Sequence, residues 1–235
     1  MEKVIQETLM QLKNQDETLF KKDVFHIVNG EVMYRNFVKS GVIDQTQITP
    51  FNEAMCVHET TFPVFSEAFV QMRAKGHHVS ARDYLKKVVD PLEKMLEGNS
   101  SCVVLWFGED VFCQMNVLTL LAYLESTDFS RDIYLNSFEE GVFRVTTHKI
   151  QLGNFQEMYK NVLLHHETPT TAAFPVLQRG VEEFLQVQHG YHPIISYMKE
   201  HREMSDREMI IQLLKGFPSL GYGDVQYKEL MDIYR

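Results

Sequence analysis

Five polar side chains, Asn29, Glu31, Glu53, Glu109 and Asp110, follow segments that read as β-strands. In an open α/β sheet, ligands bind in the crevice at the carboxyl ends of the parallel strands. If these strands are parallel neighbours, the five side chains meet along that edge, called here the strand-end rim. Several carboxylates together suit a divalent cation such as Mg²⁺, or the hydroxyl groups of a ribose or sugar. The structural alternative is that these residues bind no ligand. Acidic residues favour the first turn of a helix, and Asn-Gly is an ordinary turn.

Two further side chains complete the candidate ligand-binding site. Gln114 lies one helical turn after Asp110, so it orients Asp110, binds ligand, or forms an i,i+4 hydrogen bond. Arg82 falls in the first turn of a predicted helix, where a basic residue opposes the helix dipole. It either pairs with Glu53 or a ligand anion, or is an ordinary surface arginine. The candidate metal ligands are Glu53 and Asp110, and Asp110 is equally a candidate helix N-cap.

Several familiar chemistries are disfavoured by the sequence. It contains neither G-x-G-x-x-G nor G-x-x-x-x-G-K-[ST], the glycine-rich patterns that cradle phosphates. The helices after the first and third strands begin with acidic residues, which repel a bare phosphate. The histidine pairs are scattered and disfavour zinc, and no serine has a G-x-S-x-G setting. A metal-assisted hydrolase acting on a nucleotide-like phosphoester is conceivable only through a carboxylate-bound cation.

The elements that position these residues can be predicted from apolar periodicity. Strands are expected at 24–30, 48–55, 101–107, 132–138 and 142–147, the last two turning at Glu140-Gly141. Helices are expected at 2–17, 63–75, 80–97 and 109–126, and Pro91 should kink or split the third of these. A further helix is expected through 33–38 and should end at Ser40-Gly41. After about residue 150 only helices follow, at 153–166, 171–189, 192–202, 205–216 and 224–234.

This alternation followed by helices predicts a fold class. We expect an α/β fold with a small, mainly parallel, Rossmann-like sheet over residues 1–150, followed by an all-helical C-terminal domain over residues 151–235. The run 101–107 is apolar throughout and is expected to be buried on both faces, which places Trp106 in the core.

Composition limits the protein classes. The 235 residues carry a net charge of −9, and an acidic chain is a poor nucleic-acid ligand because phosphates need clustered Lys and Arg. The three cysteines form no C-x-x-C pair, which argues against a disulfide framework. No apolar run approaches the roughly 18 residues of a membrane span, and the N-terminal segment is mixed-charge with no apolar signal region. We therefore expect a cytoplasmic protein with no membrane association.

Three sequence phrases resemble a known family. They are FHIVNGEVMYRNFVKSGVI (25–43), FNEAM (51–55) and VVLWFGEDVFCQMNVLTLLAYL (103–124). Together they resemble the bacterial family designated domain of unknown function 1835, over roughly residues 24–145. Family members typically have Asp after H-I-V-N-G, where this chain has Glu31. They usually have Arg before Glu-Ala, where this chain has Asn52. The tail resembles the helical domain often attached to this family. No activity is established for the family, so the resemblance implies a fold and a site location but no reaction.

Three functions of different classes follow. The first is ligand or divalent-metal binding at the strand-end rim, with hydrolysis of a nucleotide-like substrate as an extension. The second is a transcription regulator or nucleic-acid adaptor that uses the helices after residue 192. From Lys199 to Arg235, however, the segment carries six basic and seven acidic residues, and thus little to offer phosphates. The third is an interaction protein without chemistry. In place of DNA binding we expect the C-terminal helices to serve packing or homodimerisation, through an apolar face that includes Ile210, Leu213 and Leu214.

Overall fold

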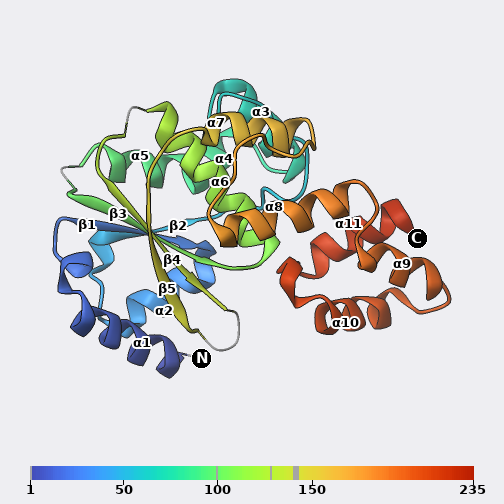
Figure 1. Cartoon of the computed structure of the whole chain (residues 1–235), viewed down its shortest axis with the longest axis horizontal. Coiled ribbons are helices and arrows are strands. Elements are labelled where there is room, and N and C mark those ends of the chain that lie inside the picture. Colours follow the sequence, from blue (N-terminus) through green and yellow to red (C-terminus); the bar gives the residue numbers. More distant parts are fainter. Residues whose placement is uncertain (1, 99, 128, 140–142) are drawn as a thin grey trace.

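A five-stranded sheet with helices on both faces forms the larger part of the protein in the computed structural model, which describes residues 2–98, 100–127, 129–139 and 143–235 (Figure 1). The strand order is β2-β1-β3-β4-β5, and the first four strands are parallel while β5 runs antiparallel to β4. The strands are β1 (Val24–Asn29), β2 (Ile48–Phe51), β3 (Cys102–Gly108), β4 (Asp132–Phe138) and β5 (Val145–Ile150). The predicted α/β class with a mainly parallel sheet is confirmed.

The central strand, β3, is buried along its whole length. Val104 and Trp106 point to one face of the sheet, and Leu105 and Phe107 point to the other. Because both faces are covered, the strand reads as an unbroken apolar run, as parallel strands in α/β proteins do. The prediction that Trp106 lies in the core is confirmed, since none of its surface is exposed.

Helices cover the two faces unequally. One face carries α1 (Glu2–Gln15) and α2 (Gly30–Ser40), whose apolar sides form a core with alternate residues of β1 and β3. The other face carries α3 (Glu67–Gly76), α4 (Ala81–Tyr84), α5 (Asp90–Leu96), α6 (Val111–Ser126) and α7 (Phe155–Tyr159) (Figure 1). Three short 3₁₀ helices lie at Glu17–Phe20, Gln45–Gln47 and Pro218–Leu220.

The helix around Pro91 shows how the chain accommodates a residue without a backbone N–H. A π-helical turn, Leu85–Val89, joins α4 to α5, and the Asp90 N–H donates to the Leu85 carbonyl. This wider turn lies directly before Pro91 and keeps the helical stretch continuous. The helical stretch therefore widens to a π turn before Pro91 and is not split there. A second π turn, Lys160–Leu164, extends α7.

Two predicted strand boundaries are wrong. β2 ends at Phe51 rather than near residue 55, because backbone groups after it bond to side chains: the Met55 N–H donates to Asn116 Oδ1 at 3.0 Å. β5 spans Val145–Ile150 instead of 142–147. The turn predicted at Glu140-Gly141 lies outside the described residues.

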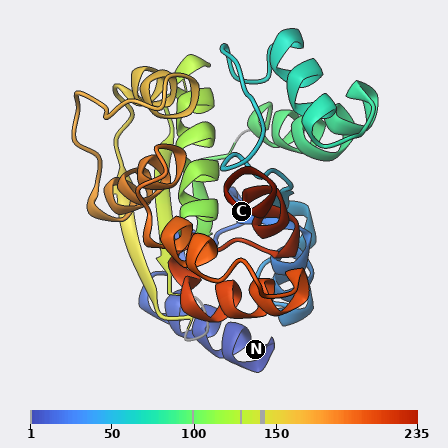
Figure 2. The ribbon, with the colours of Figure 1, turned by 90° about the vertical axis from the view of Figure 1, so that its right-hand side faces the viewer.

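The helical part of the chain lies across the carboxyl ends of the strands. It consists of α8 (Pro175–Gln188), α9 (Pro193–Glu200), α10 (Asp206–Gly216) and α11 (Asp224–Tyr234). Seen from this side, these helices lie in front of α6 and the sheet (Figure 2). α7 and α8 both pack on α6, so one apolar core runs from the sheet into the helical part. Of the predicted apolar face, Leu213 is fully buried in this core, which fits the packing alternative, whereas Leu214 is exposed.

No helix among the described residues is long and apolar enough to cross a membrane.

Candidate functional site

Glu53, in the loop after β2, is the centre of a buried polar cluster. Its Oε1 accepts hydrogen bonds from Arg73 Nη2 and from His77 Nε2, each at 2.6 Å, and from the Ala54 N–H at 2.7 Å. The Tyr84 hydroxyl donates to Oε2. The side chains of Glu53 and Arg73 have no exposed surface. A buried carboxylate with four donors is thus fully satisfied within the protein.

The charges in this cluster follow from its contacts. Burial alone raises the pKa of Glu53, but the hydrogen bond from His77 and the charge of Arg73 outweigh burial and hold that pKa well below its ordinary value. Burial by itself would lower the pKa of Arg73. The charge of Glu53 and its hydrogen bond outweigh burial, so the pKa of Arg73 is raised. Glu53 is therefore ionised and can only accept, so Nε2 of His77 must carry a hydrogen. Its Nδ1 forms no hydrogen bond with any described residue.

Arg73 also holds the loop that follows Glu53. Its Nη2 donates to the Ala54 carbonyl at 3.0 Å, and Nη1 donates to the carbonyls of Val57, His58 and Glu59 at 2.7, 3.2 and 3.3 Å. One buried guanidinium therefore satisfies four backbone carbonyls that no strand or helix accommodates. The consequence is a fixed loop, with His58 in the left-handed region at a φ of 64°.

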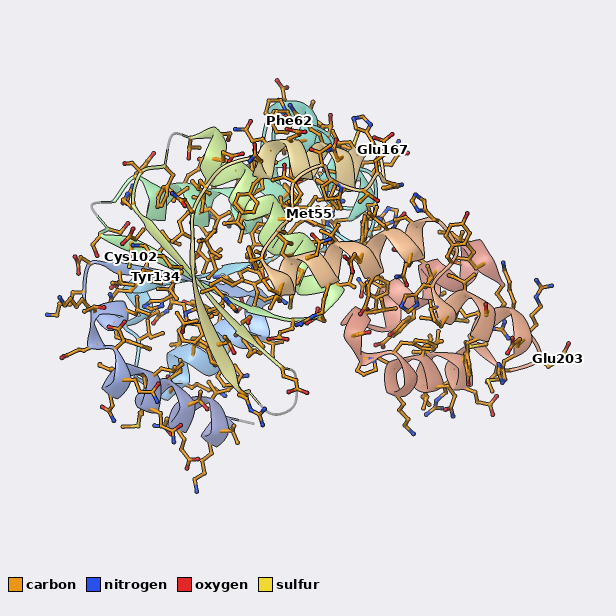
Figure 3. The ribbon with its side chains drawn as sticks, viewed as in Figure 1. Met55, Phe62, Cys102, Tyr134, Glu167 and Glu203 are labelled. Carbon is orange, nitrogen blue, oxygen red and sulfur yellow. The ribbon has the colours of Figure 1, made fainter. Side chains whose placement is uncertain are left out.

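This loop forms one wall of a cleft between the sheet-bearing part and the helical part, called here the junction cleft. Its other walls come from Leu163–His166, from α8 and from α11, and its volume is about 540 Å³. Met55 lies where the loop after β2 meets the helical part (Figure 3). The polar side chains on the walls are His58, Glu59, Thr60, His166, Gln188, Tyr222, Gln226, Glu229 and Tyr234. None of the described residues that line the cleft is Lys or Arg.

Two titratable groups face each other across the junction cleft. Nε2 of His58 lies 3.8 Å from Oε1 of Glu229, too far for a hydrogen bond but close enough for both to contact one ligand group. Burial, with the nearby charges of His77 and Arg73, lowers the pKa of His58 to about 4. Burial raises the pKa of Glu229. Perturbed groups that converge in a cleft are typical of functional sites.

The predicted rim residues Glu109 and Asp110 line a smaller cleft of about 330 Å³, called here the rim cleft. Asp110 is the N-cap of α6, and its Oδ1 accepts from the Cys113 N–H at 2.8 Å, so the structural alternative for this residue is confirmed. Glu109 pairs with Arg179 of α8 at 2.8 Å. Both predicted ligand-binding residues are therefore used to start a helix or to attach the helical part.

The amide groups of Asn29, which is half-buried, and of Gln114 form hydrogen bonds within the protein. Gln114 is fully buried, and its Nε2 donates to the Gly108 carbonyl at 2.6 Å rather than orienting Asp110. Asn29 donates to Sγ of Cys113 at 3.0 Å and accepts from Asn116 at 3.1 Å. Asn116 also donates to the Glu53 carbonyl at 2.7 Å. Sequence reasoning assigned no role to Asn116 or Cys113, and the structure corrects this.

Arg82 is exposed and forms no ion pair with any described residue. The arginine that pairs with Glu53 is Arg73 instead. A signal for it was present in the sequence, because Arg73 shares a helical face with the apolar residues Phe69, Val70 and Ala74. A charged residue at a core position of a helix requires a buried partner.

The candidate residues do not form a metal site. Glu31 pairs with Arg35 on α2 at 2.9 Å, and the carboxylate of Glu53 is saturated by its own donors. Across the described residues, no group of three or more His, Cys, Asp and Glu side chains lies in a position to hold a metal ion. The predicted Mg²⁺ ligands Glu53 and Asp110 thus gain no support.

Comparison with protein-family models, with curated proteins and with solved structures found nothing that matches this chain.

Proposed function

We propose that this protein binds a small organic molecule with a cationic group in the junction cleft. The observation that carries the proposal is the lining of this cleft: acidic and aromatic side chains converge there, and no described Lys or Arg does. The cleft lies beyond the carboxyl end of β2, on the side of the sheet where α/β proteins bind ligands.

The size and the walls suit a small molecule. A volume of about 540 Å³ falls within the range of ligand pockets, and such pockets occur preferentially between two parts of a protein. Met55, Leu163, Phe184, Leu230 and Ile233 supply apolar surface for the body of the ligand. The Arg73-held loop supplies a preformed polar wall, which lowers the ordering cost of binding.

The charge of the cleft favours a cation. Glu59 and Glu229 are the acidic lining residues, and His58 is neutral near pH 7 because its pKa is lowered to about 4. A positive group beside Glu229 would favour the ionised form of that carboxylate, so cation binding and ionisation reinforce each other. Aromatic faces from Phe184, Tyr222 and Tyr234 add cation–π attraction.

A nucleotide-like substrate, the expectation from sequence, fits this cleft less well. Its phosphates would meet two carboxylates and no described basic side chain. We also propose that the chain is related to the family designated domain of unknown function 1835. The support for this relation is the three sequence phrases.

The test compares matched ligands and matched variants. Thermal-shift screening and calorimetry would use choline, agmatine and spermidine, with neutral and anionic analogues of similar size. We expect a cation to bind and Glu229→Gln to weaken it by about tenfold, or about 1.4 kcal/mol.

Asp224→Asn is the matched control, because Asp224 is on the same helix, carries the same charge and does not line the cleft. Equal weakening by both variants, or preferential binding of the anionic analogues, would overturn the proposal.

A further inference from the structure

A third cleft lies at the carboxyl ends of β1 and β2, on the other side of the Glu53 cluster. It is called here the outer cleft, has a volume of about 540 Å³, and is lined by Glu31, Arg35, Asn52, His77, Tyr84 and Lys87 with two valines. Glu31 follows β1 and Asn52 follows β2, so this cleft satisfies the strand-end rule for ligand binding. The proposed function of the junction cleft makes no use of it.

We propose that the outer cleft is a second binding site, and that it takes a small molecule carrying a carboxylate or phosphate group. Its contacts with that group come from Lys87 and His77. The site is separate from the junction cleft and accepts a ligand of the opposite charge.

The charges in the outer cleft leave one cation unpaired. Arg35 and Glu31 neutralise each other through a 2.9 Å ion pair. Glu53 lies behind His77 with its charge balanced by Arg73 at 2.6 Å. Lys87 forms no ion pair with any residue in the described part of the chain. The outer cleft therefore attracts anions, whereas the junction cleft attracts cations.

A carboxylate fixes the ring of His77, as is common for histidines at binding sites. Its Nε2 donates to the buried carboxylate of Glu53, which fixes the orientation of the ring. The ring stacks on Tyr84 with a centroid distance of 6.2 Å and meets His58 edge-on at 5.0 Å. A quarter of the side chain (25%) is exposed, and Nδ1 is unbonded among the described residues. With Nε2 used by Glu53, Nδ1 is the ring nitrogen left for a ligand.

The neighbouring lysines provide a matched test. Lys86 and Lys87 are both exposed on the same π turn, but only Lys87 lines the outer cleft. Calorimetry would measure binding of inorganic phosphate and of succinate to the full chain and to Lys87→Gln, Lys86→Gln and His77→Gln. The two probes separate a phosphate site from a carboxylate site.

We expect one probe to bind, Lys87→Gln to weaken it by about tenfold and Lys86→Gln by less than about twofold. His77→Gln should weaken it also, and a shift of the His77 ring signals in NMR spectra on titration would place the ligand there. Equal effects of the two lysine variants, or no binding of either probe at millimolar concentration, would overturn the proposal.

The proposals for the two clefts can be tested separately. Glu229→Gln should leave anion binding in the outer cleft unchanged, and Lys87→Gln should leave cation binding in the junction cleft unchanged.

Discussion

Gly221 of the helical part lies directly against the side chain of Asp110, the N-cap of α6. A Cβ built on Gly221 would overlap the carboxylate and lie 2.8 Å from Cβ of Asp110. A similar contact lies nearby, because a Cβ on Gly180 would lie 2.6 Å from Cβ of Gln114. Two glycines thus bring the backbone of the helical part onto the start of α6. The helical part therefore packs directly against the carboxyl end of β3, where doubly wound folds bind ligands, and leaves the rim cleft beside it.

Replacing Gly221 by alanine should weaken this docking. Gly221 has a φ of 63°, and a left-handed conformation costs a residue with a Cβ about 1–2 kcal/mol before the overlap with Asp110 is counted. We expect Gly221→Ala to lower the free energy of unfolding by at least this amount in urea denaturation. Gly216→Ala is the control, since a Cβ there meets nothing within 4 Å. Equal stability of the two variants would mean that the contact is unimportant.

Asp110 should behave as a helix cap rather than as a ligand-binding residue. Its Oδ1 accepts from the Cys113 N–H at 2.8 Å, and removal of an N-cap costs about 0.5–2 kcal/mol. We expect Asp110→Ala to lose stability in this range and Asp110→Asn, which keeps the acceptor, to lose less. Cation binding in the junction cleft should be unchanged in both variants. A large loss of binding in either variant would mean that Asp110 contributes to ligand binding.

The fold was predictable because its signals are local. Apolar runs such as Val103–Phe107 identify buried strands, and alternation of strands with helices indicates a parallel sheet. The end of β2 was not predictable, because it depends on Asn116, which is 61 residues from Met55 and bonds to its N–H. A tertiary hydrogen bond of this kind leaves no mark in local periodicity.

The candidate site was predicted in part. The strand-end rule correctly placed Glu31, Glu53 and Asp110 after strands, and Asn29 at the last residue of β1. It did not predict that the helical part packs against the middle of the rim, because sequence periodicity does not show how two parts of a chain dock. The junction cleft is made of α11 and the loop after β2, which are far apart in the sequence. His58 and Glu229 therefore carried no joint signal.

His26 should make the folded protein sensitive to mild acid. Burial lowers its pKa to about 3, and among the described residues its Nε2 has no partner while Nδ1 accepts from Trp106 Nε1 at 3.0 Å. As the pH falls below about 6.5, the unfolded chain takes up a proton that the folded chain refuses, so stability is lost. Between pH 7 and pH 5 this loss amounts to about 2 kcal/mol.

The measurement is the difference between pH 7 and pH 5 in the free energy of unfolding, for the native chain and for His26→Gln. Glutamine retains an acceptor for Trp106 but does not titrate. We expect the difference to shrink in the variant. Burial also lowers the pKa of His58, His166 and His192, but these groups contribute equally in the two proteins. An unchanged difference would contradict the assignment to His26.

Glu53→Gln should be the most destabilising of these substitutions. It removes the charge that balances Arg73, which has no exposed surface, and breaking a buried pair costs about 3–5 kcal/mol. Glu31→Gln is the matched control, because it breaks an exposed pair with Arg35 that is worth about 0–1 kcal/mol.

The acid response of Glu53→Gln provides an independent check on the same pair. The pKa of Glu53 is held below that of the unfolded chain, so its contribution is present above the unfolded pKa, near 4.3, and is lost as the pH falls further. Below that pH the native chain should therefore lose stability more steeply than the variant. If the variant keeps the full stability of the native chain at pH 7, the Glu53–Arg73 pair does not hold the loop that forms the junction cleft.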